Sequence, residues 1–249
     1  MQSIMINNCD QRISLLQKRF SQAKIKYTED QIHKFLRYYD LLIETNKVVN
    51  LTSITDFDDV ISLHFVDSIS ILNFIDVDRF NSIIDIGTGA GFPGIPLKIM
   101  CPDLNITLLD SLKKRCTFLE FVIKELELEK ACVLHSRAED IGHDDAHRNH
   151  YDLCVSRAVA SISILSEYCL PLLRIGGTMV LYKSKRASEE IIEAENALNI
   201  LGARLLNKVD LNLKTSNDEY DRSLVVVSKI KETPVKYPRK AGKPEKSPL

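Results

Sequence analysis

The fold is decided by Ile83-Ile84-Asp85-Ile86-Gly87-Thr88-Gly89-Ala90-Gly91-Phe92-Pro93-Gly94. An apolar run ends beside an acid, and four of the chain's nine glycines then fall within eight residues. Glycine has no side chain, so the backbone can turn sharply and a ligand can lie against the main chain. The stretch predicts a buried strand that turns into a helix around a nucleotide-like cofactor. The dinucleotide-binding pattern GxGxxG also fits, in the register Gly89, Gly91 and Gly94.

Downstream of this turn, strand-like and helix-like segments alternate. Strands are expected at 83–86, 106–109, 132–135, 153–156 and 179–183, and helices near 93–101, 112–127, 161–173 and 186–200. This alternation predicts the α/β class, with a parallel sheet, right-handed crossovers and helices on both faces. Two more strands, 204–211 and 223–227, have no helix between them. An antiparallel pair is therefore expected to close the sheet.

Upstream of the turn, residues 10–75 are expected to be helical. Thr28 and Gln31 match a capping box. The amphipathic stripe that follows consists of Ile32, Phe35, Leu36, Tyr39, Leu42 and Ile43. A further helix is expected from 56 to 73, where His64, Asp67 and Ser68 share one face. His64 and Asp67 either orient this helical cap over a site or form a buried hydrogen-bonded pair.

The composition suits one α/β domain with a small helical appendage. The chain has 249 residues, of which 45% are hydrophobic and 27% charged. A net charge of -1 argues against binding nucleic acid by bulk charge, but it allows a local basic patch. The N-terminus is polar, and no apolar run reaches the roughly 18 residues that span a bilayer. We expect a soluble cytoplasmic protein with no membrane partner.

Cysteine and histidine usage predicts neither disulfides nor a metal site. The six cysteines are scattered without a CxxC pair, so reduced core residues are expected: Cys9, Cys101, Cys116, Cys132, Cys154 and Cys169. His143, His147 and His150 lie in one polar loop, but they lack zinc spacing and a paired cysteine. We expect no metal.

The last stretch of the chain differs from the rest. Residues 229–249 contain four of the eight prolines, seven Lys or Arg and only two Glu. This composition cannot build a core, so an extended or disordered basic tail is expected. Contact between this tail and an RNA backbone is favoured over a merely solubilising role.

Polar residues follow each predicted strand, where ligands bind in open α/β sheets. Asp85 and the glycines follow the first strand, and Asp110 follows the second, about 20 residues past the glycines, where it suits a ribose diol. The later strands are followed by the stretch 136–140, which includes Ala138 and Glu139, by Arg157 and by Lys183. Together these residues predict a cofactor site.

The residues around the turn favour S-adenosylmethionine over NAD. Both cofactors carry an adenosine ribose, so Asp110 does not separate them. Asp85 suits the cationic methyl donor and repels the phosphates of a dinucleotide. Pro93 and Pro96 also remove amide donors that would hold a pyrophosphate.

Several motifs together resemble the bacterial 16S ribosomal RNA guanine-N7 methyltransferases, the glucose-inhibited division protein B family. They are Asp85-Ile-Gly-Thr-Gly-Ala-Gly-Phe-Pro-Gly-Ile-Pro96, Leu109-Asp-Ser-Leu-Lys-Lys-Arg115, Ser156-Arg-Ala158, Lys236-Tyr-Pro-Arg-Lys-Ala-Gly-Lys-Pro244, Asn50-Leu-Thr-Ser53 and His64-Phe-Val-Asp-Ser68. Two positions depart from the family's pattern: Leu63 stands where an arginine is usual, and Ser184 where a glycine is common. Neither position belongs to the cofactor loop, so these departures would affect contacts with RNA and not the methyl transfer itself.

The resemblance implies a class I S-adenosylmethionine-dependent methyltransferase fold: a Rossmann-like, mostly parallel seven-stranded sheet with an N-terminal helical cap. Residues 1–75 would form the cap, 76–230 the methyltransferase domain and 231–249 the tail. Cofactor contacts are implied at Gly87, Phe92, Ala138, Glu139 and Arg157. Asp85, Gly89 and Asp110 join this set from their places around the turn. S-adenosylhomocysteine would be the product.

The implied substrate is a guanine in the 16S rRNA loop beside the decoding centre of the small ribosomal subunit. Guanine N7 carries an exposed lone pair, so in-line methyl transfer needs alignment and no general base. Arg157 is the expected catalytic residue, which would either contact guanine O6 or hold the cofactor. The RNA-binding candidates are Lys113, Lys114, Arg115, Lys183, Lys236, Arg239 and Lys240.

Other functions remain open from the residues alone. The same fold can methylate a small molecule or a protein, and a cofactor-binding regulator without catalysis is a second possibility. An NAD-dependent dehydrogenase is disfavoured by Asp85 and by the lack of a hydride-transfer set. We expect a monomer that acts on rRNA or on the small subunit.

Overall fold

A seven-stranded sheet forms the centre of the molecule, with strand order β3-β2-β1-β4-β5-β7-β6. The computed structural model describes residues 2–157 and 160–249, with side chains from residue 10 onward. The strands are β1 Ser82–Ile86, β2 Asn105–Asp110, β3 Ala131–His135, β4 Tyr151–Ser156, β5 Leu173–Lys183, β6 Ala203–Lys214 and β7 Glu219–Lys229. All seven strands expected from the sequence are present, and each is longer than expected.

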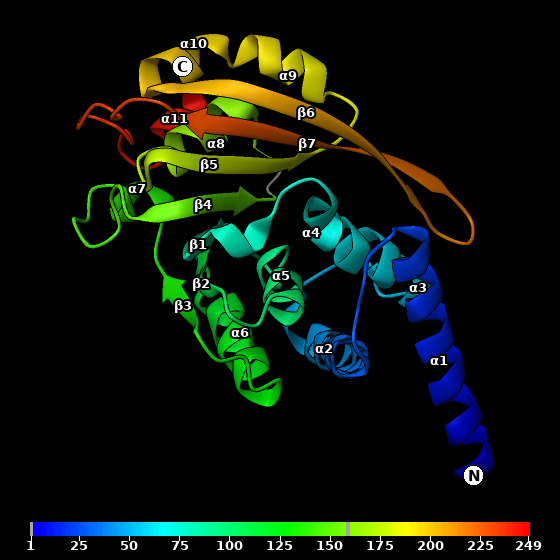
Figure 1. The fold of residues 1–249 in the computed structure, drawn as a ribbon. Coiled ribbons are helices and arrows are strands. Elements are labelled where there is room, and N and C mark those ends of the chain that lie inside the picture. The colour runs from blue at the N-terminus through cyan, green and yellow to red at the C-terminus, as the bar shows by residue number, and fades with distance from the viewer. Residues whose placement is uncertain (1, 158–159) are drawn as a thin grey trace.

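The sheet is parallel from β3 through β5 and antiparallel at its other edge. β7 runs antiparallel to both β5 and β6, so the long β6–β7 hairpin closes the sheet as expected. In Figure 1 this hairpin curves past the sheet toward α1 and α3. The carboxyl ends of β1, β2 and β4 meet at one edge, which is where the glycine turn lies.

Helices cover both faces of the sheet, as the alternating strands and helices predict. They are α5 Gly94–Met100, α6 Lys113–Glu125, α7 Ala138–Ile141, α8 Ile162–Cys169, α9 Ala187–Glu193 and α10 Glu195–Leu201. The helix expected at 186–200 is divided at Ala194. Side chains alternate along β1, so Ile83 packs with α5 and α6, whereas Ile84 and Ile86 pack with α8 and α10.

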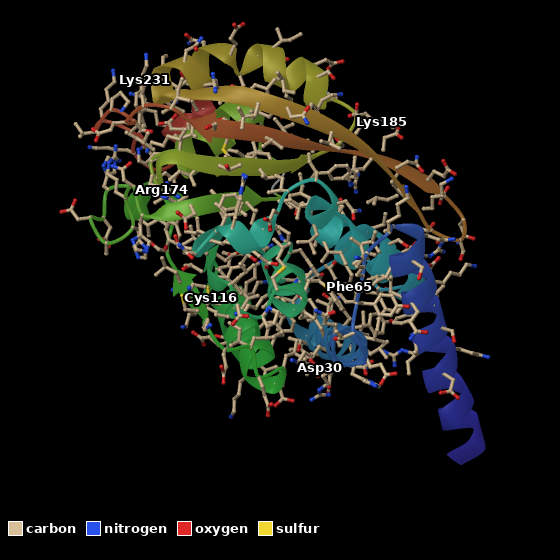
Figure 2. The ribbon with its side chains drawn as sticks, viewed as in Figure 1. Asp30, Phe65, Cys116, Arg174, Lys185 and Lys231 are labelled. Atoms are coloured by element: carbon tan, nitrogen blue, oxygen red, sulfur yellow. The ribbon has the colours of Figure 1, made fainter. Side chains whose placement is uncertain are left out.

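The N-terminal helices form the expected cap. It comprises α1 Gln2–Gln22, α2 Glu29–Val49, α3 Phe57–Val60, the π-helix η1 Ile61–Val66, α4 Asp67–Ile69 and the short 3-10 helices η2 Ser70–Asn73 and η3 Val77–Arg79. Thr28 and Gln31 form the expected capping box. The cap shares one hydrophobic core with the α5 face of the sheet. Figure 2 shows Phe65 of η1 among the side chains of that core.

The buried stripe of α2 includes four of the six expected residues, Ile32, Phe35, Leu36 and Leu42, and differs at the other two. Tyr38 and Leu41 are buried, whereas Tyr39 and Ile43 are only half-buried. Tyr39 instead packs against Phe57 and lies beside Arg12. The other faces of α2 meet α1 and α3, so the sequence period alone did not locate the centre of the stripe.

The prediction of an extended or disordered tail is wrong. The chain after β7 packs back onto the α/β domain and ends in a short helix, α11 Lys243–Lys246. Thr233, Tyr237 and Pro244 are buried. Tertiary contacts with α7, α8 and the loop before β4 hold a segment that has no core of its own.

The cysteines are reduced, as expected, where their side chains are described. Cys101, Cys116, Cys154 and Cys169 are buried, but Cys132 on the edge strand β3 is exposed, so the core assignment is wrong for that residue. The Cys9 side chain lies outside the described residues. Within 2–157 and 160–249, no helix is long and apolar enough to cross a membrane, and no cluster of three His, Cys, Asp or Glu could hold a metal.

Candidate functional site

The glycine turn follows β1 and bends around the end of β2. Gly87, Gly89 and Gly91 have φ angles of 68°, 64° and 104°, in the left-handed region that glycine tolerates best. The amides of Gly87 and Thr88 both donate to the Leu109 carbonyl, at 3.0 and 3.1 Å. The turn is therefore anchored to β2 before it enters α5.

The Asp85 side chain holds the glycine turn in place through hydrogen bonds. Its buried carboxylate Oδ2 accepts from the Thr88 hydroxyl at 2.6 Å and from the Gly94 amide at 2.8 Å. Gly94 opens α5, so the carboxylate lies at the helix N-terminus where a pyrophosphate would otherwise bind. A Cβ on Gly94 would lie 2.2 Å from a Leu108 methyl group. Burial raises the pKa of Asp85 to about 7, and Oδ1 has no hydrogen-bond partner among the described residues.

Asp110 holds the opposite side of the turn. Its Oδ2 accepts from the Gly89 amide at 3.0 Å, and its Oδ1 accepts from the Leu112 amide at 2.8 Å. Arg115 approaches Oδ2 to 3.4 Å. These bonds fix the direction of the carboxylate across the end of β2.

A pocket opens beside this carboxylate, and we call it the glycine-loop pocket. Its lining includes Gly87, Asp110, Ala138, Glu139, Tyr168 and Glu245. Four of the expected cofactor residues therefore meet there: Gly87, Asp110, Ala138 and Glu139. The other four expected cofactor residues do not line this pocket. Asp85 and Gly89 shape the glycine turn, and Phe92 and Arg157 contact each other outside the pocket.

Arg157 follows β4 and joins the α/β domain to the cap. Its Nη1 donates to the Leu63 carbonyl at 3.0 Å and to Asp67 Oδ2 at 2.9 Å. Its Nη2 approaches His64 Nδ1 to 3.2 Å, and the guanidinium lies 5.0 Å from the Phe92 ring centre. The guanidinium is therefore already held by cap atoms. Ala158, the last residue of the Ser156-Arg157-Ala158 motif, lies outside the described residues.

His64 is a neutral member of this junction. Burial and the neighbouring Arg157 charge lower its pKa to about 3. Nδ1 lies 3.2 Å from both the Leu63 carbonyl oxygen and Arg157 Nη2, and Nε2 lies 2.9 Å from the Thr52 hydroxyl. Of the two sequence-based alternatives, the geometry favours cap orientation, because His64 and Asp67 contact Arg157 rather than each other.

A second hollow, which we call the cap pocket, lies between this junction and the end of β5. Its lining includes Leu63, His64, Asp67, Arg157, Tyr182, Lys183, Ser184, Glu190 and Arg222. Lys183 is buried there, 2.7 Å from Glu190 and donating to the Ala160 carbonyl at 2.8 Å. Asp67 Oδ1 has no protein partner within the described chain, and Arg222 lies 3.7 Å from Oδ2. Both family departures, Leu63 and Ser184, line this pocket.

The other RNA candidates divide into exposed and paired side chains. Lys113, Lys236 and Lys240 are exposed, as is Lys114, whose Nζ donates to the Val49 carbonyl at 3.1 Å. Arg239 is held by Glu167 at 2.6 Å. Lys183 and Arg239 are thus already neutralised by carboxylates.

Sequence reasoning missed several residues that build the two pockets. Tyr38 reaches from the cap and donates its hydroxyl to the Ala90 carbonyl inside the glycine turn. Tyr182 donates to the Ser68 carbonyl at 2.6 Å. Arg222, Tyr168 and Glu245 approach from distant parts of the chain. Of these residues, only Tyr38 could have been suspected from the sequence, because it lies beside the predicted apolar stripe.

The amino-acid sequence is similar to those of known proteins. A family model described as "rRNA small subunit methyltransferase G" matches residues 31–223. The protein named ribosomal RNA small subunit methyltransferase G from Desulforamulus reducens is 47% identical over 94% of this chain and 97% of its own length. The protein of the same name from Lachnoclostridium phytofermentans is 48% identical over 88% of this chain and 90% of its own.

Solved structures resemble the sheet and its flanking helices. TrmN from Thermus thermophilus matches 66% of this chain and 48% of its own, with a TM-score of 0.50 and 16% identity. A branched-chain polyamine synthase variant from the same organism matches 79% of this chain and 64% of its own, with a TM-score of 0.55 and 12% identity. At these identities the likeness concerns the fold alone.

Proposed function

This chain belongs to the rRNA small subunit methyltransferase G family, and from that premise we propose that it methylates N7 of a guanine in 16S rRNA. It is an S-adenosylmethionine-dependent methyltransferase of small-subunit rRNA with the class I, Rossmann-like fold. The proposed target lies in the loop beside the decoding centre, and the proposed place of action is the cytoplasm.

The glycine-loop pocket fits S-adenosylmethionine. The Asp110 side chain suits a ribose diol, because each hydroxyl can donate to a carboxylate oxygen. Asp85 occupies the start of α5, which leaves no helix amide for a pyrophosphate. Gly87, Asp110, Ala138 and Glu139 would hold the cofactor, while Asp85, Gly89 and Phe92 shape its surroundings. The bound cofactor supplies the methyl group on a sulfonium.

The observation that carries the proposal is that one hydrogen bond joins the linings of the two pockets. Ala160 lines the glycine-loop pocket, and its carbonyl accepts from Lys183, which lines the cap pocket. Arg157 lies in the cap pocket and over Phe92, the aromatic residue of the glycine turn. This arrangement supports a base in the cap pocket with its N7 directed toward the methyl donor.

The protonation states in the cap pocket suit a nucleophile that needs no general base. With a pKa of about 3, His64 stays neutral near pH 7 and is a weak base. Lys183 is paired with Glu190, and Asp67 with Arg157. These residues align the base, and alignment alone can supply roughly 7–11 kcal/mol of barrier reduction.

The exposed lysines support contact with an RNA backbone. We assign phosphate contacts to Lys113, Lys114, Lys236 and Lys240. Lys183 and Arg239 receive positioning roles instead, because Glu190 and Glu167 already neutralise them. A few such contacts suffice for a chain of net charge -1 if they lie near the site.

The test supplies labelled S-adenosylmethionine and small ribosomal subunits that lack the modification. Borohydride–aniline cleavage then maps N7-methylguanine in the 16S rRNA. We expect one cleavage in the loop beside the decoding centre. Label on another atom, or on a protein or small molecule in place of the rRNA, overturns the proposal. Naked 16S rRNA in a parallel reaction identifies the form of the substrate.

A further inference from the structure

We infer that residues 233–246, the C-terminal strap, form a wall of the cofactor site, with Arg148 and Glu167 as their positioning residues. The inference rests on the proposed placement of S-adenosylmethionine in the glycine-loop pocket. It assigns a role to the histidine-rich loop before β4, and it gives the basic tail a second role besides the phosphate contacts proposed for Lys236 and Lys240.

The loop before β4 holds the first part of the strap by its backbone. Nη1 of Arg148 donates to the Gly142 and Tyr237 carbonyls at 2.6 and 2.8 Å, and Nη2 donates to the Thr233 carbonyl at 2.8 Å. His143 Nε2 lies 2.6 Å from the Pro238 carbonyl, so it donates. Arg148 therefore ties its own loop to two points of the strap.

The close fit of loop and strap depends on a glycine. A Cβ on Gly142 would lie 2.4 Å from Cγ of Pro238, well inside van der Waals contact. Gly142 follows α7, the helix that carries Ala138 and Glu139 into the glycine-loop pocket. The strap is thus packed against the same element that presents expected cofactor residues.

Glu167 fixes the middle of the strap. Its Oε1 accepts from the Arg239 backbone amide at 2.7 Å and from Nε at 2.9 Å, and its Oε2 accepts from Nη2 at 2.6 Å. Glu167 is 1% exposed, so water competes little with these charge-assisted bonds. It precedes Tyr168 on α8, which lines the pocket. Arg239 is therefore an anchor of the strap.

The end of the strap reaches the pocket itself. The Gly242 amide lies 3.3 Å from Glu139 Oε1, and Pro244 is buried. Glu245 of α11 lines the pocket with Glu139 and Tyr168. Burial and these two carboxylates raise the pKa of the Tyr168 phenol, which stays a neutral donor. The wall therefore presents carboxylate acceptors that suit the amino and hydroxyl donors of a nucleoside and disfavour a phosphate.

The experiment measures the dissociation constant of S-adenosylhomocysteine by calorimetry on the full chain. We expect Arg239→Ala to raise this constant about tenfold and Glu245→Ala to raise it about threefold, with Arg239→Lys recovering part of the loss. Lys231→Ala removes an exposed charge that lies before the strap, and it should leave binding unchanged. Hydrogen exchange at 237–246 should rise in Arg239→Ala, and a thermal unfolding curve shows whether the domain stays folded.

Asp110→Asn separates the two proposals. If it weakens binding while both strap variants bind as tightly as the wild type, the strap inference is overturned and the cofactor placement stands. If Asp110→Asn also binds normally, the placement fails and the strap inference with it. Glu245→Ala keeps the anchor at Arg239 intact, so its effect cannot arise from loss of the strap's fold.

Discussion

Nη1 of Arg157 lies 2.9 Å from Oδ2 of Asp67, and this ion pair joins the end of β4 to the cap. Asp67 is 1% exposed, and Arg222 is a second cation beside its carboxylate, at 3.7 Å. The same guanidinium lies over Phe92 of the glycine turn. One side chain therefore couples the position of the cap to the turn that shapes the cofactor site.

Arg157→Ala should reduce both methyl transfer and stability. Loss of alignment should lower kcat/KM by about 100-fold. Removing the nearer of the two cations beside the buried Asp67 carboxylate should cost up to about 3–5 kcal/mol of unfolding free energy, because only Arg222 remains. A filter-binding methylation assay and urea unfolding measure the two effects.

The double variant Arg157→Ala/Asp67→Asn serves as its control. Removing the buried charge should restore part of the stability but none of the transfer, because alignment is still lost. Near-normal transfer by Arg157→Ala would show that Arg157 has no part in the reaction.

Tyr38→Phe should weaken cofactor binding while keeping the aromatic packing. The variant loses the hydrogen bond to Ala90 in the glycine turn but retains the ring contacts with Phe65 and Phe92. One lost hydrogen bond of about 1 kcal/mol corresponds to a roughly fivefold rise in the dissociation constant of S-adenosylhomocysteine. Tyr39→Phe removes the neighbouring hydroxyl, which bonds to Thr55, and should bind normally. Equal effects in the two variants would contradict the prediction.

Asp85 should make the protein less stable as pH rises. Burial raises its pKa from 3.8 to about 7, so the native protein keeps a proton that the unfolded chain releases in this range. The unfolded state binds fewer protons between about pH 4 and 7, so this group lowers the unfolding free energy by about 2–4 kcal/mol across that window. In the Asp85→Asn variant the side chain resembles the neutral acid, so this part of the pH dependence of the unfolding free energy should be absent. Denaturant unfolding of both proteins from pH 4.5 to 7.5 measures the difference, and parallel curves would refute it.

Lys236→Gln/Lys240→Gln should weaken RNA binding and reduce its salt dependence. Each lost phosphate contact lowers the slope of log K against log salt by about 0.7–0.9, so the pair should lower it by about 1.5. Lys26→Gln/Lys124→Gln removes the same charge from exposed positions before α2 and on α6. An unchanged slope in the first pair, or an equal change in the second, would remove the strap from the RNA interface. The strap's backbone anchors remain in place in both proteins.

The strands and the glycine turn were predictable because they depend on local sequence. β-branched and apolar runs end at residues that favour turns, and the order of strands and helices restricts the topology to few choices. The capping box at Thr28 was equally local. The exchange of Tyr38 for Tyr39 was not predictable, because several helices surround α2 and its buried face depends on which neighbour packs most closely.

The sequence also did not predict which groups the charged side chains would contact. Arg157 could equally have faced a ligand, and only the docked cap occupies its guanidinium. Arg239 and Lys183 look like free cations along the chain, yet Arg239 meets the buried Glu167 of the distant α8, and Lys183 meets the half-buried Glu190 of α9. Such pairs bring together residues 72 positions apart in one case, so no local pattern records them.

The sequence by itself determined the class of the fold, the position of the turn and the kind of cofactor. These follow from the short-range sterics of glycine and proline and from the charge of the acids beside them. The tertiary structure alone decided that the tail packs as a strap, that the cap supplies Tyr38 to the turn and that Arg157 binds the cap. A contact between distant segments depends on the whole packed core, because only that core offsets the entropy of ordering them.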